Sequence, residues 1–114
     1  MKIIFSIILT FYSISASSQI ARLCEISAGE VRQYAERRDK GEAKAKMISE
    51  LIAWGEEKKK AFKSHTEMIN DMVDDGTDRI IWVFQSSNLK SSPNKLYDIK
   101  FDLCMKYARA LEGK

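Results

Sequence analysis

Apolar residues recur at three- and four-residue steps along most of this chain, which is the period of an amphipathic α-helix. The first such stretch covers residues 20–38, and one face of it carries Ile20, Cys24, Ser27, Val31, Tyr34, Ala35 and Arg38, with Leu23 beside them. We expect this helix to end at Asp39-Lys40-Gly41, because glycine readily adopts the left-handed conformation that terminates many helices.

The pattern from residue 42 to residue 76 predicts one further helix or two. A helix begins near Glu42, and its apolar stripe comprises Met47, Ile48, Leu51, Ile52 and Gly55. Lys58-Lys59-Lys60 interrupts that stripe before Ala61 and Phe62. A single helix over residues 42–75 is one interpretation, and a break after the lysines is the other.

A capping signal favours the break. Ser64-His65-Thr66-Glu67 matches the S-x-x-E capping box, in which the serine and glutamate side chains bond free backbone amides at a helix start. We therefore expect a helix from His65, ended by Asp74-Asp75-Gly76. Its inward residues are Met68, Ile69, Met72 and Val73.

Residues 80–84, Ile-Ile-Trp-Val-Phe, are ambiguous between strand and helix. Their intrinsic preference is for a strand. No second run of this kind exists to pair with it, and a lone buried strand leaves its backbone groups without partners. We therefore expect a short buried helix over 78–87, capped by Thr77 or Asp78, and then a polar loop from Asn88 to Ser92.

The last helix has a clear start. Ser92 is a suitable cap and Pro93 suits the first turn. Helical spacing continues to the end of the chain through Leu96, Tyr97, Phe101, Leu103, Cys104, Tyr107, Ala108 and Leu111. The sequence as a whole predicts an all-α protein, a compact bundle of four to five helices in a single domain.

The amino terminus reads as a secretory signal peptide over residues 1–18. Met1-Lys2 is followed by twelve uncharged, mostly apolar residues, Ile3 to Ile14, and then by Ser15-Ala16-Ser17-Ser18. An uncleaved membrane anchor is the alternative, but a bilayer needs about 20 apolar residues. Residues 21–23 before Cys24 do not form a lipobox. The mature domain is then 19–114, periplasmic or secreted, with no stable membrane anchor.

Cys24 and Cys104 are the only cysteines. An even cysteine number in an exported protein predicts a disulfide, here between the first and last helices. Closing a loop of about 80 residues is worth about 4.5 kcal/mol on chain-entropy grounds. Catalytic or metal-binding thiols are the alternative, but there is no CxxC spacing and His65 is the single histidine.

The charge is small overall and uneven along the chain. The net charge of +3 falls to +2 when Lys2 leaves with the signal peptide, which argues against a nucleic-acid binder. Residues 32–63 hold ten basic and six acidic side chains, whereas residues 64–78 hold five acidic ones and no Lys or Arg. These blocks are either solvated helix faces or a polarised surface that steers a partner.

No catalytic or metal-binding set is assembled in the sequence. Ser64 and His65 are adjacent and do not face one another on a helix. The run from Asp71 to Gly76 lacks oxygen ligands at two positions that a calcium loop needs. Glu25, Glu30 and Glu50 are the remaining candidates for acid–base chemistry. We predict a non-enzymatic protein without a cofactor.

The remaining prediction is that this protein binds another protein. The bulky aromatic residues Trp54, Trp82, Phe84, Phe62 and Tyr97 are expected in the core, with Trp54 partly exposed. Exposed aromatic residues anchor protein interfaces. The predicted interface residues are Trp54, Lys58, Lys59, Lys60, Asp74 and Asp75.

Three features together resemble a group of small exported bacterial proteins. They are the run Arg37-Arg38-Asp39-Lys40-Gly41 after a cysteine-bearing helix, the apolar segment 80–84 before a polar loop, and Cys104 in the last helix. The chain is also distantly similar to periplasmic immunity proteins and to acid-stress periplasmic chaperones. The resemblance implies an inhibitor or immunity factor, or alternatively an acid-stress chaperone, and carries no site residue over. A small hydrolase that uses Glu25, Glu30, Glu50 or His65 is a third hypothesis, which does not come from the resemblance.

Overall fold

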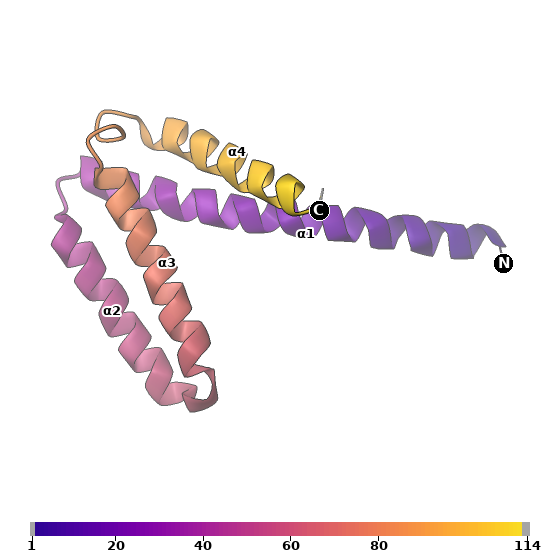
Figure 1. The fold of residues 1–114 in the computed structure, drawn as a ribbon, viewed down its shortest axis with the longest axis horizontal. Coiled ribbons are helices and arrows are strands. Elements are labelled where there is room, and N and C mark those ends of the chain that lie inside the picture. Colours follow the sequence, from indigo (N-terminus) through magenta and orange to yellow (C-terminus); the bar gives the residue numbers. More distant parts are fainter. Residues whose placement is uncertain (1, 113–114) are drawn as a thin grey trace.

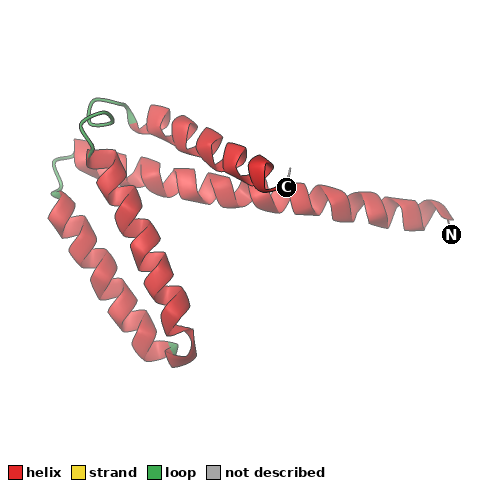
Figure 2. Ribbon diagram, viewed as in Figure 1, coloured by secondary structure: helices red, strands yellow, loops and turns green. Residues whose placement is uncertain are grey.

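Four helices make up the computed structural model, which describes residues 2–112 and the side chains of residues 19–111. They are α1 (Lys2–Asp39), α2 (Lys44–Ala61), α3 (Thr66–Phe84) and α4 (Pro93–Glu112), with a 3₁₀ turn at Lys63–His65 between α2 and α3 (Figures 1 and 2). No strand occurs among the described residues. The predicted all-α bundle is confirmed, and its helix number is four.

The helices form two pairs. α4 lies along α1, and α2 lies along α3, while α3 also crosses α1 near the end of that helix (Figure 1). We call the first pair the α1/α4 arm and the second the α2/α3 arm. Figure 1 shows the two arms diverging from the end where α1 leads into α2 and α3 leads into α4.

The core lies where the arms join. Val31 and Ala35 from α1, Val83 from α3 and Leu96 from α4 are fully buried against one another. Tyr34, Trp82, Phe84 and Ile99 pack around them. Burying one large aliphatic side chain contributes about 1.5–3 kcal/mol, so this small cluster fixes three helices together.

The predicted disulfide is confirmed. Cys24 in α1 and Cys104 in α4 are bonded, with their Cα atoms 5.5 Å apart. Cys24 is fully buried, and Ala28 and Val31 continue the buried face of α1 from it toward the core. The bond therefore holds together the part of the α1/α4 arm that α3 does not reach.

The α2/α3 arm is held by close approach at two glycines. A Cβ atom added to Gly55 of α2 would lie 2.6 Å from Cγ2 of Val73, and one added to Gly76 of α3 would lie 2.6 Å from Cδ2 of Leu51. Both glycines and Ile69 are buried. The absence of side chains at these positions lets the two helices pack closely.

Arg38 joins the two arms through backbone carbonyl groups. Its side chain is buried, and it donates to the carbonyls of Val83 (2.7 Å), Asn88 (3.1 Å) and Ser91 (2.8 Å). The side-chain amide of Asn88 donates to the carbonyl of Trp82 at 2.9 Å. These bonds satisfy acceptors at the end of α3 and in the loop that follows it.

The helix boundaries at Gly41 and Ser92 agree with the sequence prediction. Gly41 has a φ of 89°, in the left-handed region, and follows the end of α1. At the start of α4 the backbone amide of Lys95 donates to the hydroxyl oxygen of Ser92 at 3.2 Å. Glycine and serine are favoured at these two positions for the reasons given above.

The separate helix predicted over residues 78–87 is wrong, as is the helix end at Asp74-Asp75-Gly76. α3 continues without a break from Thr66 to Phe84. Gly76 is not a terminator, because the approach of Leu51 gives it a packing role inside the helix. The strand alternative for residues 80–84 is wrong for the same reason: Ile80 and Val83 continue the buried face of α3.

The predicted capping box is also wrong, although the interruption between two helices that it indicated is present. Ser64 lies within the 3₁₀ turn, and α3 begins at Thr66 without a side-chain capping bond. The Thr66 hydroxyl donates to the carbonyl of Lys63 at 3.0 Å instead. Because α2 ends at Ala61, the single helix over residues 42–75 is excluded.

The side chains of residues 1–18 lie outside the described ones, so the signal peptide stays a prediction. None of the helices in the described part of the chain has the length and apolar character needed to cross a membrane.

Candidate binding groove

An apolar groove opens near the end of the α2/α3 arm that is remote from the core. We call it the tip groove. It has a volume of about 300 Å³ and is lined by Trp54, Lys58, Phe62, His65, Met68, Ile69 and Met72. Phe62 and Met68 are 53% and 55% exposed, whereas Ile69 is buried and forms the floor. The groove thus presents apolar side chains to solvent on a two-helix support.

A second hollow lies between the two arms. This base cleft has a volume of about 380 Å³ and is lined by Glu30, Tyr34, Leu51, Trp54, Met72, Asp75, Gly76 and Arg79. Trp54 and Met72 line both hollows. The tip groove and the base cleft therefore adjoin at these two side chains.

The base cleft is polar where the arms meet. Arg79 of α3 donates to Glu30 of α1 at 2.9 Å and to the Ser27 hydroxyl at 3.2 Å. Burial, reinforced by the negative charge of Glu30, raises the pKa of the Tyr34 phenol above its ordinary value of 10.0. Tyr34 is therefore protonated at neutral pH and can donate a hydrogen bond within the cleft.

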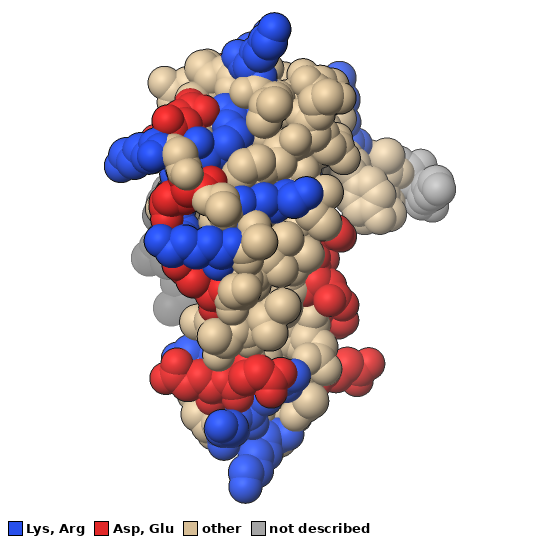
Figure 3. Space-filling model, turned by 90° about the vertical axis from the view of Figure 1, so that its left-hand side faces the viewer, with Lys and Arg blue, Asp and Glu red and all other residues tan. Residues whose placement is uncertain are grey.

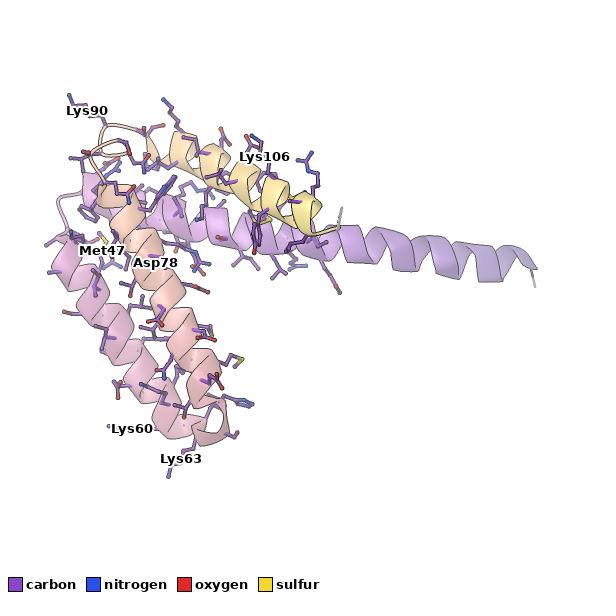
Figure 4. All side chains as sticks on the ribbon, in the orientation of Figure 1. Met47, Lys60, Lys63, Asp78, Lys90 and Lys106 are labelled. Carbon is purple, nitrogen blue, oxygen red and sulfur yellow. A yellow bond between two sulfur atoms is a disulfide. The ribbon has the colours of Figure 1, made fainter. Side chains whose placement is uncertain are left out.

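Lysines gather around the tip groove. Lys58 lines it, and Lys60 and Lys63 lie at the far end of the arm (Figure 4). Among the described residues, none of these three forms an ion pair. Lys59 differs, because it pairs with Glu56 at 2.9 Å and donates to Asn70 at 3.0 Å. Figure 3 shows basic side chains at the lower end of the molecule, acidic side chains crossing the face directly above them, and side chains of both signs beside the uncharged strip higher up.

The structure brings together only some of the predicted interface residues. Trp54 and Lys58 share the tip groove, and Asp75 shares the base cleft with Trp54. Lys59, Lys60 and Asp74 line neither hollow. The predicted partial exposure of Trp54 is observed, since its side chain is half-buried.

Three groove residues were assigned inward by the sequence and are not. Phe62 was expected in the core, but it follows the last residue of α2 and no helix covers it. Met68 and Met72 belong to the predicted inward stripe, of which α2 covers only Ile69 and Val73. The apolar stripe is wider than the surface that one neighbouring helix can cover. This width was the sequence feature that could have indicated that some of its side chains stay exposed.

The candidates for chemistry are dispersed. His65 lines the tip groove and is exposed, Glu30 pairs with Arg79, and Glu50 accepts a bond from Arg37 at 2.6 Å. Within residues 19–111, no three His, Cys, Asp or Glu side chains are grouped so that they could hold a metal ion.

Comparisons of this chain with protein families, with curated proteins and with solved structures give no match.

Proposed function

We propose that this protein binds another protein, and that the tip groove receives an amphipathic helix of the partner with acidic residues beside its apolar stripe. The observation that carries the proposal is the position of the exposed Phe62, Met68 and Met72 next to lysines without ion pairs. Apolar grooves between two helices are a common docking site for helices, which insert side chains at three- and four-residue spacing.

The dimensions of the surface suit a helix. The linings of the tip groove and of the base cleft beside it together run along α3 from Met68 to Arg79, which corresponds to roughly 16 Å at 1.5 Å per residue, or about three helical turns. Methionine is flexible and adapts to irregular apolar surfaces, so Met68 and Met72 suit the inner part of such a site. Trp54 adds a large aromatic anchor that is already partly ordered by packing.

The charge of the surface selects the partner. Lys58 lies in the groove and Lys60 and Lys63 lie at the far end of the arm, so an acidic segment of the partner can pair with these lysines, which favours and speeds its association. The Glu30–Arg79 pair and Asp75 make the base of the surface mixed in sign. The acidic residues of the partner helix are therefore expected at the tip and not at the base.

The proposed setting is outside the cytoplasm, periplasmic or secreted, after removal of residues 1–18. A disulfide is compatible with an oxidising compartment. In this setting the protein acts without catalysis, by covering part of the surface of a partner enzyme as an inhibitor or an immunity factor does.

Isothermal titration calorimetry with two synthetic helical peptides tests the docking chemistry. Both peptides carry the same leucine stripe, and one has glutamates where the other has lysines beside it. We expect the acidic peptide to bind at least tenfold more tightly, and Met68→Glu to weaken it at least tenfold. Leu89→Glu, at an exposed leucine in the loop after α3, is the control. Equal affinities, or no effect of Met68→Glu, would contradict the proposal.

The natural partner is sought by affinity capture from periplasmic extract with the wild type and the same two variants. A protein retained by the wild type and by Leu89→Glu, but lost with Met68→Glu, is the expected result. Capture of the same proteins by all three forms would contradict a role for the groove.

A further inference from the structure

A second apolar surface lies on the α1/α4 arm, away from the tip groove. It is formed by Leu23, Ile26, Leu103, Tyr107 and Leu111, and we call it the arm patch. Leu23 is 65% exposed and Tyr107 is 69% exposed, and the other three are about half exposed. The disulfide between Cys24 and Cys104 lies beside it, so the two helices are rigidly linked at this place.

The arm patch continues a face that α3 covers nearer the core. On α4, Leu103 follows the buried Leu96 by seven residues, which is about two turns, and so lies on the same side of the helix. Leu96 packs against Val83 of α3. On α1, Leu23 precedes Ser27 by four residues, and Ser27 accepts a bond from Arg79 of α3. Both helices therefore turn this side toward α3 where α3 is present.

The divergence of the arms exposes the rest of that face. α3 leads away from α1 and α4, whereas α4 continues beside α1 (Figure 1). A two-helix layer with one apolar side is half of a four-helix bundle, and the missing half is another layer of the same kind. A second copy of this chain supplies such a layer.

We propose that two copies associate through their arm patches, so that the two α1/α4 arms form a four-helix bundle about a two-fold axis. The five side chains expose on the order of 600 Å² per copy, against roughly 800 Å² buried by each partner in a standard interface. A patch of this size is at the upper limit for a monomeric protein. The association is therefore expected to depend on protein concentration.

The charges around the arm patch favour a second copy over a lipid surface. Arg22, Lys106 and Arg109 are exposed beside it, and so are Glu25 and Asp102 (Lys106 is labelled in Figure 4). A surface with both signs can be complementary to itself in a two-fold arrangement. An anionic membrane attracts basic residues and repels the acidic ones.

Sedimentation equilibrium of the oxidised protein, expressed from its full reading frame, tests this proposal at concentrations from about 1 to about 200 μM. We expect a monomer–dimer equilibrium. Leu103→Glu is expected to raise the dimer dissociation constant at least tenfold. The matched control, Leu89→Glu, places the same change at a leucine of similar exposure, 48% against 51%, outside the patch. Circular dichroism verifies that each variant is folded, and Tyr107→Asp replaces Leu103→Glu if that variant is not.

Three outcomes would overturn the proposal. The first is a monomer at every concentration. The second is a dimer that Met68→Glu weakens and Leu103→Glu does not, which assigns the contact to the tip groove. The third is a monomer that sediments with phosphatidylglycerol vesicles and is released by Leu103→Glu, which assigns the patch to lipid. Because the tip groove is tested with Met68→Glu, failure of either proposal leaves the other standing.

Discussion

The two arms are both antiparallel helix pairs, but different interactions hold them together. The α1/α4 arm has a covalent bond near its far end and the apolar core at the junction. The α2/α3 arm has no covalent link and depends on the contact of its glycines with Val73 and Leu51. Several of its large apolar side chains, including Phe62 and Met68, face solvent.

This difference separates the features that stabilise the fold from the proposed binding surfaces within one small chain. A disulfide near the end of the α1/α4 arm leaves few side chains needed to hold α1 and α4 together there, so the arm patch, which α3 does not cover, is free for an interface. In the α2/α3 arm, the two helices approach each other closely at Gly55 and Gly76. Larger side chains nearby are left at the rim of a groove. The exposed apolar residues of the α1/α4 arm lie near the disulfide, and those of the α2/α3 arm lie near the closely packed glycines.

Among the changes that distinguish the two arms, removal of the disulfide is expected to have the largest effect on the free energy of unfolding. Cys24→Ser combined with Cys104→Ser is expected to lower the free energy of unfolding by up to about 4.5 kcal/mol, because the unfolded chain regains the freedom of a long closed loop. Urea denaturation of the wild type and the double variant measures it. A loss below about 1 kcal/mol would show that the α1/α4 arm does not need its covalent link.

Arg38 tests the junction that joins the arms. Arg38→Met is expected to cost about 3 kcal/mol, because the carbonyls of Val83, Asn88 and Ser91 lose their donor. The adjacent arginine is the matched control. Arg37 forms partly exposed ion pairs with Glu42 and Glu50, so Arg37→Met is expected to cost less than about 1 kcal/mol. Equal effects of the two substitutions would contradict this account.

Replacing each of three glycines with alanine, one at a time, compares how closely the helices of the two arms are packed. Gly55→Ala is expected to destabilise the protein by about 1–2 kcal/mol, because the added methyl meets Val73, a side chain with little rotamer freedom, and this outweighs the gain in helix propensity. Gly76→Ala is expected to be close to neutral, because the flexible end of Leu51 can move.

Gly29 in the α1/α4 arm is the contrasting position. Nothing lies within 4 Å of an added Cβ there, so Gly29→Ala is expected to stabilise the protein by up to about 1 kcal/mol. Thermal unfolding ranks the three variants. A Gly55→Ala protein as stable as Gly29→Ala would show that the α2/α3 arm is not closely packed.

Acid is expected to have the smallest effect, through Glu42, which precedes α2, and Glu56 within α2. Hydrogen bonding from Arg37 lowers the pKa of Glu42, and hydrogen bonding from Lys59 lowers that of Glu56. A carboxyl whose pKa is lowered by folding adds stability above its unfolded pKa, and this contribution is lost as the pH falls through the folded value. Stability is therefore expected to fall below about pH 4.5.

The acid effect is measured from urea midpoints between pH 7 and pH 3. Glu42→Gln is expected to reduce the pH dependence. Glu57→Gln is the control, since Glu57 has no ion pair with any residue whose side chain is described. An unchanged pH profile in Glu42→Gln would contradict the role of the Arg37–Glu42 pair.

The sequence anticipated those elements whose signals are local. The left-handed Gly41, the Ser92 cap and the helical spacing of Cys24, Val31 and Ala35 each act within a few residues, and the structure confirms them. The disulfide was also foreseeable, because two cysteines allow a single pairing within the chain. The capping signal at Ser64 failed because the chain uses a 3₁₀ turn there.

The candidate site was only half foreseen. Trp54 and Lys58 were predicted as interface residues and both line the tip groove, whereas Phe62, Met68 and Met72 were assigned to the core. An apolar stripe indicates that some surface is buried but not by how many helices. Only the packing partner decides how much of the stripe stays exposed.

By itself, the sequence determined that this chain is helical, where most helices begin or end, and that its ends are tied together, because these depend on spacing, caps and cysteine number. The tertiary structure decided that α3 continues through Gly76, that Arg38 serves three carbonyls, and that the arms diverge. Each of these depends on which residues from distant parts of the chain meet, and the helical periodicity of one segment does not indicate which other segment it contacts.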